Sequence, residues 1–370
     1  MRIGIDAHAA EEDGSGNCTY IRNLLTALAV LDRENEYFLY VRDADHPFIR
    51  AWEIPANFHI RRLRPKAPLL RIPISLALAS RRDRLDVLHV QFIAPPVHRG
   101  ELVATIHDLG FLHLPRTFPR LFVWRSRILI RRTARRAARI ITGSSLSRDD
   151  LMNAYGLRED RIALIPYGVA PGYSAPRDAA ETGRVLAKYG VRRPYILTVS
   201  RINPRKNLVR LAAAFRRFKG LVPEPRQLVV VGKDDYDSKP TMESVAAGNE
   251  GDVVATGYVP DEVLRHLYGS AETFVYVSLF EGVGLPVFEA MASGVPVVTS
   301  ASSSMAELAA GAAVLVDPRK EEELVRALVR LALDRTFRAE RIESGRRRAE
   351  RLSWDEAARR TLEVYRDVGR

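Results

Sequence analysis

Short apolar runs alternate with amphipathic segments along the whole of this 370-residue chain. In the first half, the runs that read as strands are RIGIDA, YFLYV, FHIRRL, VLHV, LVATIH and RIITGS. The second half repeats the plan with YILTVS, QLVVVG, VVATGY, TFVYVS, PVVTS and AVLVD. Segments between them, such as LVRLAAAFRRFK and EELVRALVRLAL, carry apolar residues at helical spacing. This alternation predicts an α/β chain in which parallel sheets are covered by helices.

The chain divides into two halves of similar plan, and its length suffices for two cores. The join lies around residues 170–194, where prolines, glycines and mixed charge follow the turn IPYGVAPG. We therefore expect an N-terminal Rossmann-like domain at 1–172 and a C-terminal one at 173–354, followed by a terminal helix. Two such domains in tandem place a cleft between the carboxyl ends of their sheets.

The net charge of +12 favours an anionic partner, which can be nucleic acid, anionic lipid or a phosphorylated small molecule. The single cysteine, Cys18, excludes an internal disulfide and suits a reducing compartment. No uninterrupted apolar run reaches the length of about 20 residues that a spanning helix needs. These features predict a cytoplasmic protein that can lie peripherally on the inner face of the plasma membrane.

The stretch FEGVGLPVFEAMASGVPVV follows a predicted strand and opens a helix. Pro286 suits the first helical position, and the free N–H groups of a helix start favour an anion. Gly282 and Gly284 allow a ligand to approach the backbone. Glu289, expected in the first turn, can accept hydrogen bonds from two ribose hydroxyls, and Glu281 is placed for a sugar hydroxyl. Alternatively, Glu289 only complements the helix dipole and Glu281 is solvated.

The loop VSRINPRKN, between a predicted strand and a helix, brings Arg201 and Lys206 to the carboxyl end of that strand. Two fixed cations are what a diphosphate leaving group requires. Arg205 is expected to face solvent. The alternative is a solvated basic turn.

Two motifs of the first half give weaker evidence for a ligand-binding site. His107 ends the strand LVATIH, and Asp108 beside it either fixes the imidazole or caps the next turn. Gly14 and Gly16 in GSGNCTY can admit a phosphate, but a third glycine is missing. No acidic residue stands where a ribose ligand would be needed, so nicotinamide binding is rejected.

Taken together, these residues resemble the retaining family-4 glycosyltransferases of the GT-B fold over nearly the whole chain. The most specific part is the Glu-x7-Glu pattern, supported by SRINPRKN, VVGKDD, TGYVPDEVLRHLYGSA and LSWDEAARRTLEVY. The resemblance implies that a nucleotide-sugar binds the second domain and a glycan or lipid-linked glycan acceptor the first. It also implies that the terminal helix, about 355–370, packs back on the first domain. No metal ion and no other cofactor is implied.

By matching position, the resemblance assigns catalytic roles to His107, Glu281, Arg201 and Lys206. It assigns donor binding to Gly16, Gly232, Lys233, Tyr258, Val259, Gly282, Val283, Gly284, Leu285 and Glu289. The donor implied by similarity to bacterial mannosyltransferases is GDP-mannose, with UDP-sugars as the alternative. One departure is Cys18, which stands where the family often has a second glycine in the first loop.

A basic stretch from Arg116 to Arg139 contains no acid and is interrupted by apolar and aromatic residues. Such a helix can lie on an anionic membrane surface, or its arginines can be a solvated face. Competing functions are a nucleotide-sugar epimerase, a glycogen-type phosphorylase, an inactive scaffold and a nucleic-acid-binding protein. Nucleic-acid binding would give Glu281 and Glu289 no role, so no nucleic-acid partner is expected.

Overall fold

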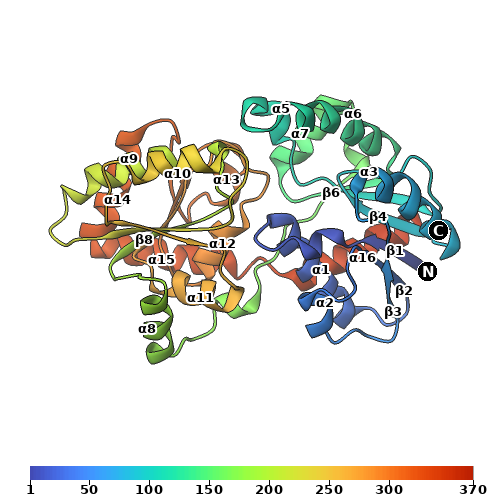
Figure 1. Cartoon of the computed structure of the whole chain (residues 1–370), viewed down its shortest axis with the longest axis horizontal. Helices are drawn as coiled ribbons and strands as arrows, with labels where there is room; N and C mark the ends of the chain where they lie inside the picture. The colour runs from blue at the N-terminus through green and yellow to red at the C-terminus, as the bar shows by residue number, and fades with distance from the viewer. Residues whose placement is uncertain (370) are drawn as a thin grey trace. The chain divides into compact units, whose positions relative to one another are not determined.

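The computed structural model describes residues 1–369, which fold into two compact units (Figure 1). The first unit contains Met1–Leu112, Arg120–Gly168 and the chain from Trp354 onward. The second contains Val169–Ser353 together with His113–Pro119. The sequence had assigned the short segment 113–119 to the first domain, so its place in the second unit is a correction.

The first unit is built on a seven-stranded sheet of order β3-β2-β1-β4-β5-β6-β7, parallel throughout. Its strands are β1 (Arg2–Asp6), β2 (Glu36–Val41), β3 (Phe58–Arg62), β4 (Val87–Gln91), β5 (Glu101–Thr105), β6 (Arg139–Thr142) and β7 (Ile162–Leu164). The strand order reverses between β1 and β4, which makes that point the topological switch of the sheet.

The second unit has a six-stranded parallel sheet of order β10-β9-β8-β11-β12-β13. Its strands are β8 (Tyr195–Val199), β9 (Gln227–Val231), β10 (Val253–Gly257), β11 (Thr273–Tyr276), β12 (Val297–Ser300) and β13 (Val314–Val316). Here the order reverses between β8 and β11. All twelve predicted strands are confirmed, as are the α/β class and the parallel sheets; only the three-residue β7 was not predicted.

Helices connect the strands in both units. Those of the first unit are α1 (Gly16–Leu31), α2 (Pro47–Ala51), α3 (Pro68–Leu70), α4 (Ala77–Arg82), α5 (Gly110–His113, which ends at the unit boundary), α6 (Arg120–Arg136), α7 (Ser145–Tyr155) and α16 (Trp354–Val368). Those of the second are α8 (Ala179–Lys188), α9 (Leu208–Lys219), α10 (Ser238–Ala246), α11 (Asp261–Ser270), α12 (Leu285–Ala292), α13 (Ser303–Leu308), α14 (Glu321–Leu333) and α15 (Arg335–Ala349). A π-helical stretch, η2 (Arg71–Leu76), joins α3 to α4, and 3-10 turns include η1 (His8–Glu11) and η6 (Pro204–Lys206).

The second sheet is covered on both faces. On one face α9, α10 and α14 pack a continuous apolar core against β8, β9 and β11. On the other face α8, α11, α12 and α15 pack against one another (Figure 1). The chain therefore leaves β8 and β11 toward opposite faces of the sheet. The two loops that follow these strands flank a space at the carboxyl edge.

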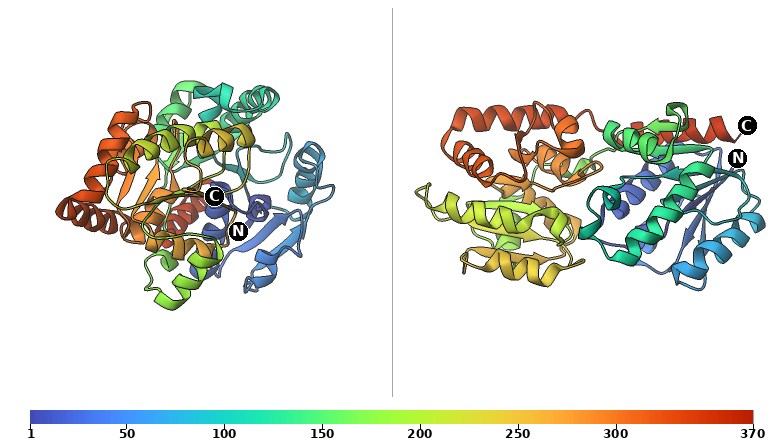
Figure 2. Two further views of the ribbon diagram at one scale, coloured as in Figure 1. Left: turned by 60° about the vertical axis from the view of Figure 1, so that its left-hand side comes forward. Right: turned by 90° about the horizontal axis from the view of Figure 1, so that it is seen from above.

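The terminal helix α16 packs against α1 in the first unit. Its buried Tyr365 hydroxyl lies 2.6 Å from Nδ1 of His89 on β4, which ties the helix to the sheet. The helix ends beside the start of β1, so the two ends of the described chain lie side by side (Figure 2).

Candidate functional site

Lys206 and Glu281 meet at the switch point of the second sheet. Lys206 belongs to the turn η6 after β8, and Glu281 to the loop after β11. The Nζ atom of Lys206 donates hydrogen bonds to Glu281 Oε1 at 2.6 Å and to the Tyr276 hydroxyl at 2.7 Å. Both members of the ion pair are buried, with 9% of Lys206 and 7% of Glu281 exposed. The structure thus joins two residues that the sequence singled out separately, 75 positions apart.

The charge state of Glu281 follows from these neighbours. Burial alone would raise the pKa of its carboxyl, but the charges of Arg205 and Lys206 outweigh burial and lower the pKa to about 2. Glu281 is therefore a carboxylate throughout the physiological range. The alternative of a solvated Glu281 is wrong.

Arg205 was expected to face solvent, and this was wrong. Its Nη1 atom lies 3.2 Å from Glu281 Oε1 and donates to the carbonyl oxygen of Phe280 at 2.7 Å. The 3-10 geometry of η6 turns both consecutive cations toward the loop after β11. Three charges thus share this site, two positive and one negative, and the net positive charge suits an anionic ligand.

The segment 113–119 covers the same loop. The ring of His113 stacks on Phe280 with 4.5 Å between ring centroids and 19° between planes. The Arg205 guanidinium lies 5.9 Å from the centroid of the Phe118 ring. These contacts explain why the segment belongs to the second unit, and single-sequence patterns contain no signal for them.

Arg201 lies at the same edge, held by the loops after β8 and β9. Ser200 N–H donates to Val231 O, and Ile202 N–H donates to Lys233 O, each at 2.9 Å. Gly232 has φ +149°, and a Cβ added there would lie 1.8 Å from the carbonyl oxygen of Ser200. Glycine is thus required at 232 for the loop that carries Arg201 to keep its path.

Lys233 and Tyr258 are also brought together. The Lys233 ammonium lies 4.6 Å from the centroid of the Tyr258 ring, which is partly exposed. Val259 beside it is buried, with 2% exposed. An exposed aromatic face next to a cation can take a planar base.

Helix α12 begins at Leu285, so Pro286 occupies its second position and not the first as predicted. Residues 282–285 are buried. Gly284 caps the helix with φ +72°, and a Cβ there would lie 2.7 Å from Met305 Sδ on α13. The glycine at 284 is therefore required by both conformation and space.

Glu289 lies beyond the first turn of α12, which contains no acidic residue, so its predicted first-turn position was wrong. Its carboxyl is 7% exposed and receives a hydrogen bond from the Tyr268 hydroxyl at 3.0 Å. Burial, with a smaller effect of the Asp261 charge, raises the pKa of Glu289 to about 8. At pH 7 it is therefore mostly a protonated acid, which can both donate and accept.

In the first unit, His107 lies two residues beyond β5 and is 8% exposed. Burial lowers the pKa of its imidazole to about 3, so the ring is neutral. Nε2–H donates to Gln91 Oε1 at 2.9 Å, and the Tyr167 hydroxyl donates to Nδ1 at 2.7 Å. Asp108 instead accepts from the N–H of Gly110, so it caps the next turn. His107 is thus a fixed neutral group and not a titrating base.

The loop before α1 is held by polar contacts of its own. Ser15 caps the helix by accepting from the N–H of Cys18 at 3.1 Å. Gly16, the first residue of α1, has open space where a Cβ would be. The Cys18 thiol is buried and lies 3.6 Å from the carbonyl oxygen of Ala10 in η1, which it can donate to. The side chain of Cys18, which stands where a glycine is frequent in the family, therefore points inward and leaves Gly16 accessible.

The sequence interpretation missed four residues that contact predicted site residues: Tyr268 and Tyr276 in the second unit, and Gln91 and Tyr167 in the first. Tyr276 lies in a fully buried strand, where a phenol needs a partner, and this was an available signal. Gln91 and Tyr167 end up beside His107 only through the fold.

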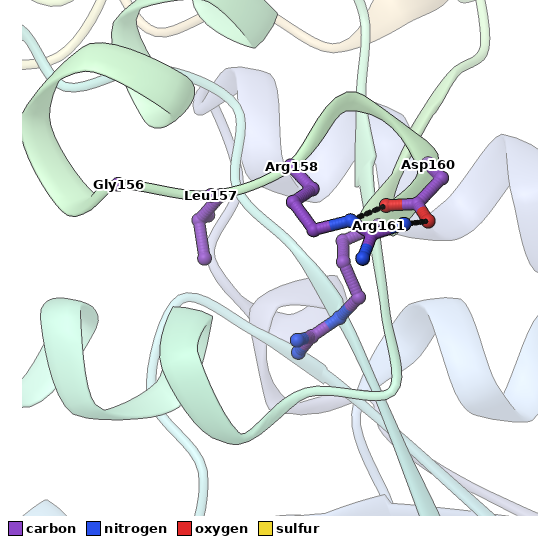
Figure 3. A pocket seen from close by; sticks show the side chains of 5 residues that line it. All are labelled: Gly156, Leu157, Arg158, Asp160 and Arg161. Atoms are coloured by element: carbon purple, nitrogen blue, oxygen red, sulfur yellow. Dashed lines mark hydrogen bonds and ion pairs between the residues drawn. The ribbon is translucent and has the colours of Figure 1, made fainter.

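A cavity of about 300 Å³ lies elsewhere in the first unit, lined by residues 156–158, 160 and 161 (Figure 3). Arg158 and Asp160 form an exposed ion pair at its rim. Because this loop precedes β7, it lies at the amino edge of the sheet, opposite to the edge where His107 lies. Within residues 1–369, no group of three histidine, cysteine or acidic side chains is placed to hold a metal ion, and no helix is long and apolar enough to span a membrane.

Comparison with known proteins places these features in a family. Residues 187–348 match the family described as "Glycosyl transferases group 1", and residues 16–173 match "Glycosyltransferase Family 4". The chain is 31% identical over 290 residues to O-antigen chain mannosyltransferase B of Escherichia coli, covering 77% of this chain and 75% of that protein. It is 28% identical to the MMP alpha-(1->4)-mannosyltransferase of Mycolicibacterium hassiacum, covering 99% and 98%.

Among solved structures, sucrose-phosphate synthase from Thermosynechococcus elongatus superimposes with a TM-score of 0.81 at 21% identity. The match covers 99% of this chain and 98% of that one. At this identity the likeness concerns the fold, which is GT-B.

Proposed function

The chain belongs to the family-4 glycosyltransferases of the GT-B fold, and from this premise we propose that it transfers mannose from GDP-mannose to a glycan acceptor with retention of anomeric configuration. Two relatives, at 31% and 28% identity, are named mannosyltransferases, which supports mannose as the sugar.

The observation that carries the proposal is the meeting of the loops after β8 and β11 at the sheet's switch point. In open parallel sheets, ligands bind in the crevice at this place. Lys206 and Arg205 lie there with Glu281, and Arg201 lies on the same loop. In the proposed complex, Arg201 and Lys206 hold the diphosphate and stabilise the charge that develops on it as it departs. Because these cations take up that charge, the proposed reaction uses no metal ion.

The proposed chemistry breaks the bond between sugar C1 and the diphosphate oxygen, and forms a bond from C1 to the acceptor oxygen on the same face. The acceptor proton passes to the departing phosphate oxygen, so no side chain needs to act as a base. This agrees with a neutral, doubly hydrogen-bonded His107, which in the proposal contacts the transferred sugar. Glu281 accepts hydrogen bonds from the sugar hydroxyls.

The nucleoside binds on the other side of the diphosphate in this proposal. Glu289 takes the ribose hydroxyls, and the partly exposed Tyr258 with Lys233 meets the base. The backbone of Gly232 and of residues 282–285 approaches the phosphates and the sugar, and Gly16, at the start of α1, is in this proposal a further donor contact.

A thermal-shift panel of GDP, UDP and ADP tests the donor site. A ligand at 100 times its Kd stabilises the folded state by about 2.7 kcal/mol. We expect GDP to give this rise with wild type and to lose it with Lys206→Met. The matched control is Lys219→Met, which removes a lysine of the same unit that pairs with Asp252 away from the site.

Each outcome assigns a different activity. A shift with UDP alone would replace GDP-mannose by a UDP-sugar, and conversion of the donor sugar without any acceptor would indicate an epimerase. No shift with any nucleotide would refute the proposed donor site. Transfer that persists in EDTA is expected, and its loss would refute a metal-independent reaction.

The basic stretch supports an anionic membrane surface as a further partner. Leu121, Trp124 and Ile128 form one stripe along α6 and are 73%, 64% and 49% exposed. Val123 and Ile130 on the opposite side are buried. Exposed arginines continue around and beyond the apolar stripe, at positions 120, 127, 131, 132, 135 and 136. Apolar side chains flanked by cations suit the headgroup region of an anionic bilayer.

Flotation with phosphatidylglycerol-containing vesicles tests this partner. We expect wild type to float and Trp124→Glu to remain in solution at physiological salt. Leu221→Glu is the control, since Leu221 is 57% exposed in the second unit and outside the stripe. Wild type that does not float would refute membrane binding and would leave the α6 arginines as a solvated face.

A further inference from the structure

His8 is a second imidazole at the carboxyl edge of the first sheet, and it differs from His107 in its contacts. It lies two residues beyond β1, in η1. Its Nδ1 is 2.8 Å from Asp6 Oδ1. In the part of the chain that the structure describes, no hydrogen-bond partner of its Nε2 is found, and 20% of the side chain is exposed. Both ring nitrogens of His107 are occupied, whereas His8 has one nitrogen available.

Asp6 fixes the orientation of His8. The carboxyl of Asp6 is 1% exposed. Burial would raise its pKa, but the charge and hydrogen bond of His8 and the charge of Arg71 together lower it to about 2. Asp6 is therefore an ionised group that can only accept, so Nδ1–H of His8 must donate to it. The second ring nitrogen, Nε2, is then directed away from Asp6.

Arg71 is a second ion-pair partner of Asp6, besides His8. Its guanidinium is 1% exposed and lies 3.1 Å from Asp6 Oδ1. Arg71 begins the π-helical stretch η2, a rare conformation that occurs frequently at functional sites. Asp6 Oδ2 and Arg71 Nε are buried without a hydrogen-bond partner within residues 1–369. The buried ion pair of Asp6 and Arg71 thus holds in place the carboxylate that orients the partly exposed imidazole of His8.

The position of His8 within the first sheet suits ligand binding. Asp6 ends β1 at the topological switch of the first sheet, where ligands of such sheets bind. β4 lies between β1 and β5, so the ends of the strands that precede His8 and His107 are about 10 Å apart at the usual strand spacing. A single pyranose ring fits within that distance.

We propose that His8, oriented by Asp6 and Arg71, binds a hydroxyl of the sugar acceptor through Nε2. The inference rests on the proposed function, because it assigns the acceptor side of the same reaction. A hydrogen bond between the acceptor hydroxyl and Nε2 holds the acceptor sugar in place without removing its proton. His8 is thus an acceptor-binding residue whose chemical partner is a polyol or sugar hydroxyl.

The test is a titration of the full chain, labelled with ¹³C and ¹⁵N in histidine, with methyl α-D-mannopyranoside and methyl α-D-glucopyranoside, with and without GDP. The His8 ring signals are identified by their absence from His8→Ala. In that variant Asp6 keeps Arg71 as its partner, so the fold is expected to persist. We expect a saturable shift of the His8 signals in wild type and a reduced shift in Asp6→Asn.

In transfer assays with the same glycosides, we expect His8→Ala to raise the acceptor KM at least tenfold, while the GDP-induced thermal shift stays the same. His98→Ala is the matched control, since His98 is a partly buried histidine near the start of β5, at the opposite edge. Unmoved His8 signals with both glycosides, or an unchanged acceptor KM, would overturn the inference. Failure of wild type to bind GDP would refute the donor site instead, and the titration without GDP would still report on His8.

Discussion

Glu281→Gln removes the negative charge beside Lys206 and keeps the shape of the side chain. The pKa of Glu281 is about 2, against an ordinary value of 4.5. A difference of this size corresponds to about 3 kcal/mol of unfolding free energy. Removing one partner of a buried ion pair costs a similar amount. We therefore expect the variant to be less stable than wild type by about 3 kcal/mol at pH 7.

The sign of the pH dependence follows from the lower pKa in the folded chain. The contribution of Glu281 is fully present above pH 4.5 and is lost as the pH falls toward 2. The difference in stability between wild type and Glu281→Gln should therefore shrink to about half its neutral value at pH 3.

Denaturation in urea, followed by two signals, measures this difference. The three tryptophans, Trp52, Trp124 and Trp354, all lie in the first unit, so their fluorescence reports on that unit. Far-UV circular dichroism reports on both units, and comparing the two signals shows whether they unfold together. The effect of Glu281→Gln should appear in the circular dichroism transition of the second unit.

Glu272→Gln is the matched control. Glu272 accepts from Arg226 Nε at 2.7 Å in another largely buried ion pair of the second unit, located before β9 and β11 and so at the amino edge. Both variants should be destabilised, but only Glu281→Gln should lose transfer. Equal stability of Glu281→Gln and wild type at pH 7, or a difference as large at pH 3 as at pH 7, would refute the reasoning.

Three further variants probe the loops, the buried acid and the imidazole. Gly232→Ala should weaken GDP binding at least tenfold by calorimetry, because its Cβ would lie 1.8 Å from Ser200 O and displace the loop after β8. Wild type should lose up to about 5 kcal/mol of stability, measured by urea denaturation, between pH 4.5 and 8, and Glu289→Gln should abolish this loss. The pKa of Glu289 is raised to about 8, so its contribution to stability is present at low pH and is lost as the pH rises toward 8. Tyr167→Phe should move the ¹⁵N signal of His107 Nδ1 and lower kcat more than it changes donor KM, because the ring loses the hydroxyl that donates to it.

Two substitutions serve as controls for this set, and each has a failing outcome. Gly183→Ala places a Cβ in open space on α8 and should leave GDP binding unchanged. Tyr155→Phe removes a buried hydroxyl that has no partner within the described residues and should leave the His107 signal in place. A wild-type GDP affinity in Gly232→Ala, a retained pH dependence in Glu289→Gln or an unmoved His107 signal in Tyr167→Phe would each contradict the corresponding contact.

The fold could be predicted because each strand in a two-faced parallel sheet must be apolar throughout. Runs such as QLVVVG and TFVYVS satisfy that requirement, and the structure places both as central strands. The strand β7 escaped because three residues are too few to form a recognisable run. The predicted strand ends were accurate enough to assign the loops of the site to the carboxyl edge of each sheet.

The contacts within the site could be predicted only in part. Strand-end positions bring Lys206 and Glu281 to one edge, but no spacing rule says that they form a direct pair or that Arg205 joins them. The burial of Glu289 against Tyr268 depends on how α11 packs on α12, which is a tertiary property. Residues 113–119 show the same limit, since only three-dimensional packing places them on Phe280.

The pairing of Lys206 with Glu281 also implies that a bound diphosphate competes with Glu281 for Lys206. A buried ammonium needs a counter-charge, and Glu281 supplies it in the protein without ligand. A diphosphate at Lys206 would take over this role and release the Glu281 carboxylate to accept from sugar hydroxyls. Glu281→Gln should therefore bind GDP more tightly than wild type, because the diphosphate no longer competes with a carboxylate. It should gain less for GDP-mannose, because the sugar loses its charged acceptor. Calorimetry that finds GDP bound more weakly by Glu281→Gln would show that Glu281 and the diphosphate do not share Lys206.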